Sequence, residues 1–169
     1  MLALGLSVDD NASPDAEIEE QCTALTAPRH PLARELVCHW REEHARGGFI
    51  VGIHIPSRKL AKLLPALSLH EPIDGGRDFH TRLAGSALLR RFGRDISGRR
   101  LTQLFGPKRL AYHRGLMQRT VLHGEPFILD VRAVRDGLSR LHFELVGLQV
   151  FSPDCRHAWV LKGHFHFAD

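Results

Sequence analysis

The last third of the chain carries the pattern that most restricts the fold. Apolar residues alternate with more polar ones over 127–133, again over 141–151 and again over 159–167. Asp-Gly at 136–137 and Ser-Pro-Asp at 152–154 separate the three runs, and both are turn-forming sequences. Alternation with a period of two places one set of side chains on a single face of a strand. The three runs therefore predict an antiparallel three-strand meander with one buried face.

The middle run has a change of parity. Its apolar positions are odd-numbered from Leu141 to Leu145 and even-numbered from Val146 to Val150. The change falls around Gly147, and a glycine inside a strand often marks a bulge. We therefore predict a bulge or a strong twist at this residue.

Shorter elements precede the meander. Apolar patterns and turn residues predict strands over 67–70 and 78–83, separated by Asp-Gly-Gly at 74–76. Helices are expected at 30–46, 58–64, 86–92, 101–105 and 108–122. Together with the meander these elements predict an α+β fold, in which helices cover one side of a five-stranded sheet.

The N-terminal part differs in character from the rest. Residues 1–20 carry six carboxylates and no Lys or Arg, so we predict that residues 1–28 form an acidic, flexible arm. We assign residues 29–66 to a helical extension and residues 67–169 to a sensory core. The helix over 30–46 has an apolar face that we expect to pack against a second copy or a partner protein. Its residues are Leu32, Leu36, Val37 and Trp40.

Two glycine-bearing segments in the middle of the chain resemble the signature of a known family. They read FHTRLAGS over 79–86 and RFGRDISGRRL over 91–101. The corresponding patterns, F-x-x-R-L-A-G-[ST] and F-G-R-[DE]-[LI]-[ST]-G-x-x-L, are typical of a PAS-like bacterial family of small stand-alone proteins common in alphaproteobacteria. The resemblance covers residues 30–167. It implies a PAS fold, with a five-stranded antiparallel sheet, helices on one face and an extra N-terminal helix.

The resemblance also implies a class of function. PAS modules sense and regulate without catalysis, so we expect a role in bacterial signal transduction by docking, as a homodimer or on a histidine kinase or other signalling protein. The alternative is a dedicated small-molecule receptor, whose ligand shifts a conformational population. Either function would use a cavity between helices and sheet. The candidate residues there are Arg82, Phe92, Asp95, His113, Met117 and Phe143.

Sequence motifs for catalysis are missing. The chain has no Walker A loop, no G-x-G-x-x-G and no G-x-S-x-G, so we predict that it is not an enzyme. Its three cysteines lack CxxC spacing. His164 and His166 alternate with the apolar residues of the last strand, beside Lys162, and we assign all three to the exposed face. We therefore expect no metal site.

His113 lies on the mostly apolar face of the helix over 108–122, where haem-binding PAS domains offer an axial ligand. A core histidine with satisfied hydrogen bonds is the preferred interpretation, and haem is kept as an alternative. No cysteine lies near residues 98–103, which argues against a flavin photoreceptor.

Charge and hydropathy restrict the partners. The net charge is +4, and residues 82–119 carry ten Lys and Arg against Asp95 alone. No nucleic-acid motif accompanies this stretch, so we prefer a solvated face and keep nucleic-acid binding as a weaker alternative. No apolar run is long enough to span a bilayer, and no signal peptide is evident, which predicts a soluble, cytoplasmic protein.

Overall fold

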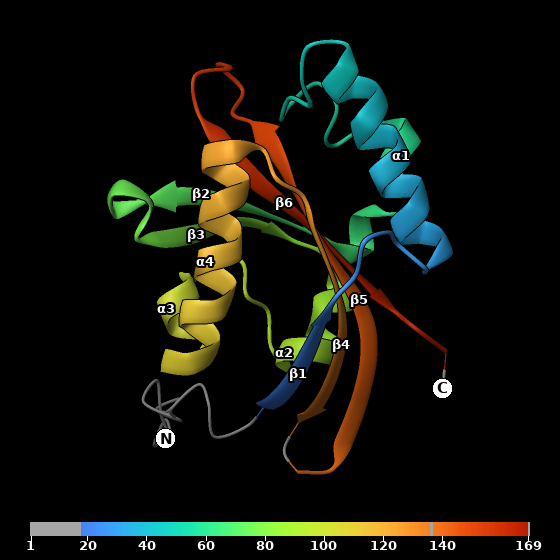
Figure 1. Ribbon diagram of the computed structural model, residues 1–169, viewed down its shortest axis with the longest axis vertical. Coiled ribbons are helices and arrows are strands. Elements are labelled where there is room, and N and C mark those ends of the chain that lie inside the picture. The colour runs from blue at the N-terminus through green and yellow to red at the C-terminus, as the bar shows by residue number, and fades with distance from the viewer. Residues whose placement is uncertain (1–17, 136, 169) are drawn as a thin grey trace, which may run out of the picture.

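The computed structural model describes residues 18–135 and 137–168. Six antiparallel strands form one sheet in the order β1-β4-β5-β6-β2-β3 (Figure 1). Their bounds are β1 Ile18–Ala24, β2 Leu67–Ile73, β3 Asp78–Ala84, β4 Phe127–Arg135, β5 Ser139–Phe151 and β6 Ala158–His166. The predicted α+β class and the predicted meander of β4, β5 and β6 are confirmed. The sheet has six strands where five were expected, because β1 is added beside β4.

Within the described residues, four α-helices accompany the sheet. They are α1 Pro31–Ala45, α2 Leu89–Phe92, α3 Leu101–Leu104 and α4 Pro107–His123. Both long helices begin with proline at the first position, where a missing N–H costs nothing. The α4 helix ends at Gly124, which adopts a left-handed conformation with φ of 68°. The helix expected over 58–64 is instead two 3₁₀ turns, Arg58–Leu60 and Leu64–Ala66.

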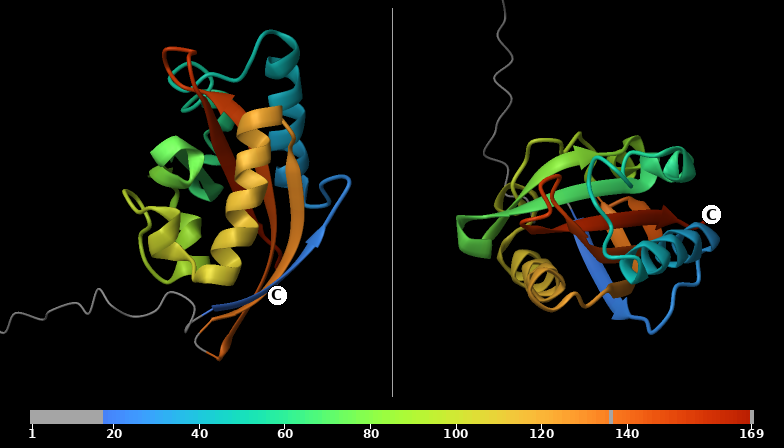
Figure 2. Two further views of the ribbon diagram at one scale, coloured as in Figure 1. Left: turned by 60° about the vertical axis from the view of Figure 1, so that its left-hand side comes forward. Right: turned by 90° about the horizontal axis from the view of Figure 1, so that it is seen from above.

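The helices cover both faces of the sheet. Helices α2, α3 and α4 pack on one face, here named the α4 face, and α1 packs on the other, the α1 face. Figure 1 shows α4 beside α3 and well apart from α1, and the right-hand view of Figure 2 also shows α4 and α1 apart. Each face has its own apolar core. This arrangement determines which side chains of the central strands are buried.

The change of parity in β5 follows from these two cores. Odd positions from Leu141 to Leu145 lie in the core of the α4 face, and even positions from Val146 to Val150 lie in the core of the α1 face. Pairing with β6 continues through Gly147 without a shift of register, and Gly147 pairs with Phe127 at the start of β4, so the predicted bulge is absent, while the alternative of a strong twist stays a prediction. Gly147 is needed for another reason. A Cβ there would lie 2.1 Å from the ring of Phe127.

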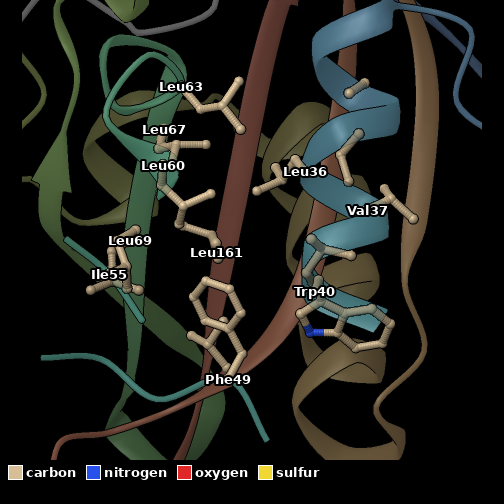
Figure 3. Packing of buried hydrophobic residues seen from close by; sticks show 14 of the residues in the cluster. Leu36, Val37, Trp40, Phe49, Ile55, Leu60, Leu63, Leu67, Leu69 and Leu161 are labelled. Carbon is tan, nitrogen blue, oxygen red and sulfur yellow. The ribbon is translucent and has the colours of Figure 1, made fainter. Parts of the chain in front are cut away.

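The α1 face holds the apolar side of the N-terminal helix. Leu36 points from α1 toward β6, while Leu60 and Leu63 reach the same cluster from the other side of that strand (Figure 3). Trp40 is buried in this cluster, and its Nε1 donates a hydrogen bond to the backbone oxygen of Gln149 at 2.6 Å. The residues of the predicted helical extension therefore complete the core of the same sheet. The division at residue 66 stays a prediction.

Part of the predicted N-terminal arm is a strand of the sheet. Residues 18–24, assigned from sequence to the flexible arm, form β1 and pair with β4 from Ile18↔Arg135 to Ala24↔Leu129. Residues 1–17 lie outside the described residues. Strand β1 is followed directly by α1, and the backbone N–H groups of Arg29 and His30 donate to the carboxylate of Glu144 at the junction.

The two signature segments bind each other. The backbone N–H of Thr81 donates to Arg99 O at 2.8 Å, and Gly98 N donates to Thr81 O at 2.9 Å. Gly85 lies so close to the turn before β2 that a Cβ would be 2.2 Å from the backbone oxygen of Pro65. These contacts explain the spacing of the two segments and fix the start of α2 over the sheet.

Candidate functional site

A buried ionic cluster lies between β1 and the helices of the α4 face. Both oxygens of Glu20 are bound by Arg91, with Nε at 2.9 Å from Oε1 and Nη2 at 3.2 Å from Oε2. Arg109 Nη2 lies 2.7 Å from Oε1, and His113 Nε2 lies 3.1 Å from Oε2. We name these four residues the Glu20 cluster. The Arg91 side chain has no exposed surface, and that of Glu20 is 2% exposed.

The register of β1 places Glu20 in the interior. Glu20 pairs with Ala133 of β4, whose side chain is in the core of the α4 face, whereas the preceding Glu19 is exposed. Side chains alternate along a strand, so two adjacent glutamates have opposite environments. Arg91 comes from α2, and Arg109 and His113 come from α4. The cluster therefore joins the added strand to two helices.

A chain of hydrogen-bond contacts continues from the cluster across the sheet. Arg91 Nη1 lies 3.4 Å from His164 Nδ1 on β6, and His164 Nε2 lies 3.1 Å from Ser68 Oγ on β2. Ser68 Oγ is 2.8 Å from His70 Nε2, and His70 Nδ1 is 3.3 Å from Thr81 Oγ1 on β3. We name His164, Ser68, His70 and Thr81 the histidine chain. It connects the Glu20 cluster to the strand that carries the first signature segment.

Aromatic rings surround the cations. The guanidinium carbon of Arg91 lies 4.8, 5.4 and 5.1 Å from the ring centroids of Phe92, Phe105 and Phe143. Phe105 also stacks on His113, with 4.6 Å between ring centroids. Rings next to a guanidinium supply cation–π attraction in place of water. The interior is therefore apolar at its walls and ionic at its centre.

Burial and charge perturb the ionisable groups. Burial alone would raise the pKa of Glu20, but Arg91, His113 and Arg109 hold it well below its ordinary value, so the carboxylate is ionised. Burial lowers the pKa of His113 to about 4, and burial also holds the pKa values of His70 and His164 well below 6.5. These histidines are therefore neutral at pH 7. They act as hydrogen-bonding groups and add no positive charge.

Lys162 adds a further cation to the interior. Its side chain projects from β6 into the core of the α4 face, where it is 2% exposed and Nζ lies 5.9 Å from the centroid of Phe105. Burial, followed by the charge of Arg91, lowers the pKa of Lys162 to about 7. Among residues 18–135 and 137–168, no carboxylate lies within ion-pair distance of Nζ.

A family comparison agrees with this architecture of a helix-covered antiparallel sheet. The family model described as PAS domain matches residues 29–157, which is more than half of the chain. The chain belongs to the PAS domain family. As a PAS domain it is expected to be a sensory or regulatory module. No curated protein and no solved structure matches it.

The match does not cover the whole site of this PAS domain. Arg91, His113 and most of the histidine chain lie within the matched residues 29–157. Glu20, Lys162 and His164 lie outside them. Glu20, which pairs with Arg91, and His164, which lies 3.4 Å from it, therefore come from the two ends of the described chain. In the part of the chain that the structure describes, no helix has the length and apolarity to cross a membrane.

The residues predicted from sequence to line a cavity fall into two groups. Phe92, His113, Met117 and Phe143 lie in the interior of the PAS domain, in or beside the Glu20 cluster. Arg82 and Asp95 are exposed. Arg82 Nη1 lies 3.4 Å from Glu71 Oε2 rather than near Asp95, and Asp95 Oδ1 accepts a hydrogen bond from Ser97 N at 2.9 Å.

The residues predicted to form an interface are part of the fold's own core. Leu36, Val37 and Trp40 are buried against β5 and β6, and Leu32 is partly buried beside them. A partner could bind these side chains only after α1 had left the sheet. The predicted interface stays a prediction, and it would require α1 to move away from the sheet.

Two groups of polar residues are placed differently from expectation. Lys162 and His164, assigned to the exposed face, are buried because the α4 face of β6 is covered by helices. Arg91 and Arg109, counted in the basic stretch over 82–119, point into the interior, where they pair with Glu20 instead of facing a nucleic-acid backbone. The sequence did contain a signal that Lys162 and His164 are buried. They alternate with Trp159 and Leu161 on a strand, and the neighbouring strands carry apolar residues on both faces.

Cation binding fits this site poorly. Glu20, Cys22 and His113 offer ligand atoms within 4.8 Å of one another. However, both Glu20 oxygens are held by guanidinium or imidazole groups, and burial raises the pKa of the Cys22 thiol to about 11. Haem ligation by His113 would require its Nε2 to leave Glu20. The residues present suit an anion better than a metal ion.

Proposed function

We propose that this PAS domain is a non-catalytic, cytoplasmic module of bacterial signal transduction. It binds a small molecule at the Glu20 cluster and passes the response to a partner protein through its N-terminal segment. The observation that carries the proposal is the ion pair of Glu20 with Arg91. It ties a strand added to the sheet, and through it the start of α1, to the interior where a ligand would bind.

The composition of the interior supports a sensory role. Removing a charge pair from water costs several kcal/mol, and well-packed apolar side chains of similar volume often give equal or higher stability. A domain selected for stability alone would fill the space around Arg91 with apolar groups. Charged and histidine side chains in this position give the interior a polarity that a ligand can change.

The histidine chain does not point to catalysis. Ser68 Oγ lies 2.8 Å from His70 Nε2, which is the distance expected for a nucleophile and a general base. However, His70 Nδ1 meets Thr81 Oγ1 at 3.3 Å rather than a carboxylate that would orient it as a base, and Ser68 Oγ is also 3.1 Å from His164 Nε2. The contact is better suited to holding the strands in register.

The route of the response follows the chain. Strand β1 continues into α1, and Glu144 fixes the junction by binding the N–H groups of Arg29 and His30. A ligand that changes the bonding of Glu20 therefore changes the position of β1 at the sheet edge. We propose that a second copy or a signalling kinase reads this edge. An exposed strand edge pairs readily with another chain.

Native mass spectrometry of freshly purified protein tests the proposal. We expect wild-type protein to carry extra mass that is lost on denaturation, and Arg91→Met protein to lack it. Arg90→Met is the matched control, since Arg90 is the exposed neighbour of Arg91 on α2. Loss of the extra mass in both variants, or its absence from all three proteins, would contradict ligand binding at the cluster.

A further inference from the structure

We infer that the interior of the α4 face is a carboxylate-binding site, that Glu20 occupies it in the free protein, and that a small carboxylate with an apolar body replaces Glu20 and releases β1. This inference rests on the proposed function and names the ligand class and the response.

The charges of the interior are unequal. Arg91 and Lys162 are both buried in the core of the α4 face, and Glu20 binds Arg91 through both of its oxygens. No described carboxylate is within ion-pair distance of Lys162 Nζ. A buried cation without a counter-charge is costly. An anion that contacts Arg91 and Lys162 together would give Lys162 a counter-charge at contact distance, which Glu20 does not.

The geometry favours a carboxylate. Arg91 presents Nε and Nη2 side by side to two oxygens, which is the planar, bidentate arrangement that carboxylates accept. His113 Nε2 lies close to one of the same oxygens. Phe92, Phe105 and Phe143 surround the guanidinium. A ligand with an apolar or aromatic body would place that body against these rings.

The strand that carries Glu20 is able to leave. Strand β1 is at the edge of the sheet and pairs only with β4 among the described strands. Its last backbone bond to β4 joins Leu25 N to Ile128 O, and the next fixed point is the junction held by Glu144. Residues 18–25 can therefore separate from the sheet while α1 stays packed on the α1 face.

Glu20 competes with the ligand as a tethered group. A tethered group acts at an effective concentration of about a millimolar or more, so a small anion with the same contacts binds weakly to the wild-type protein. A larger carboxylate gains the contact with Lys162 and the packing on Phe105 that Glu20 lacks. The site thus selects for molecules that supply more than the charge of Glu20.

Chemical rescue of Glu20→Ala tests the anion site. Formate and acetate are expected to raise the melting temperature of this variant saturably, by roughly 5–10 °C at about a hundred times Kd, whereas acetamide and chloride at equal concentration do not. Glu19→Ala, which removes the exposed neighbour, should show no such rise. Inorganic phosphate is included, and a rise as large as that with formate would overturn the choice of a carboxylate.

The double variant Glu20→Ala/Lys162→Met tests the role of Lys162. We expect the benzoate affinity, read from the same melting-temperature titration, to fall at least tenfold relative to Glu20→Ala. Equal affinities, or equal effects of acetate and acetamide on Glu20→Ala, would overturn the inference.

Hydrogen exchange of the wild-type protein tests the release of β1. With benzoate as the probe, the amides of Gln21, Thr23 and Leu25, which face β4 in the register given by the bond from Leu25 N to Ile128 O, should exchange at least tenfold faster, while those of α1 stay protected. Rescue of Glu20→Ala without faster exchange of β1 in the presence of benzoate would overturn the displacement. A neutral co-purified ligand in the native mass spectrum, together with no rescue by carboxylates, would leave the proposed function standing and refute this inference alone.

Discussion

Replacing Glu20 by Gln should destabilise the protein more than any other change that preserves shape. The substitution keeps the size and part of the hydrogen bonding of the side chain but removes the negative charge. Arg91, which has no exposed surface, and Arg109 then lose the counter-charge described above. Breaking a buried ion pair by removing one partner costs about 3–5 kcal/mol. For a domain of this size the melting temperature should fall by about 6–20 °C.

Urea unfolding provides the measurement. Tryptophan fluorescence is suitable because Trp40 and Trp159 both lie in the core of the α1 face, away from the substituted residue. Glu19→Gln is the control, and as an exposed change it should stay within about 0.5 kcal/mol of wild type. The double variant Glu20→Leu/Arg91→Met should recover at least half of the loss, because it removes both charges together.

The result that would refute this reasoning is specific. If Glu20→Gln lies within about 0.5 kcal/mol of wild type, a threshold typical of exposed substitutions, then Glu20 is not a buried counter-charge in solution. An equally large loss in Glu19→Gln would instead indicate a general effect of charge on β1. Either outcome would remove the ionic link between β1 and α2.

Three further predictions concern other parts of the molecule. In the folded protein the pKa of Lys162 is lowered to about 7 from 10.5, so between these pH values the unfolded chain binds more protons than the folded one. Lys162 therefore makes the free energy of unfolding rise with pH by up to about 1.4 kcal/mol per pH unit over this window. Lys162→Met should remove this slope in urea titrations at several pH values. Gly147→Ala should lower the free energy of unfolding by about 1–3 kcal/mol, because the new Cβ collides with the Phe127 ring. Gly115→Ala has open space in α4 and should leave the free energy of unfolding unchanged or raise it by up to about 1 kcal/mol. Thermal unfolding of both variants provides the measurement. Trp40→Glu should unfold the protein in circular dichroism, because it buries a charge beside β5. A folded monomer from this variant would favour a dimer interface only if the wild type is a dimer, and a wild-type monomer that the substitution leaves unchanged would refute the interface.

Much of the secondary structure is determined locally. Pro31 and Pro107 begin the long helices, Gly124 ends α4, and the alternating runs of the last third form β4, β5 and β6. Each of these signals acts through residues only a few positions apart. The sequence therefore predicts the meander and the long helices, and the two signature segments correctly indicate the family.

The faces of the strands required the tertiary structure. An alternating pattern shows that two sides of a strand differ, but it does not show whether the polar side meets water. Lys162 and His164 follow the pattern of an exposed face and are buried, because α4 covers β6 on that side. The parity change in β5 likewise reflects two cores on opposite faces of a regular strand.

The candidate site is the part that only the tertiary structure decided. Phe92, His113, Met117 and Phe143 could be expected in the interior from family resemblance and helix periodicity. Glu20 could not, because its acidic surroundings are typical of a solvated arm, and its partners Arg91 and His113 are 71 and 93 residues away. Local sequence determines which residues can form strands and helices. The burial of a charge depends on distant groups that replace its water, and those groups meet only when the sheet and helices have packed.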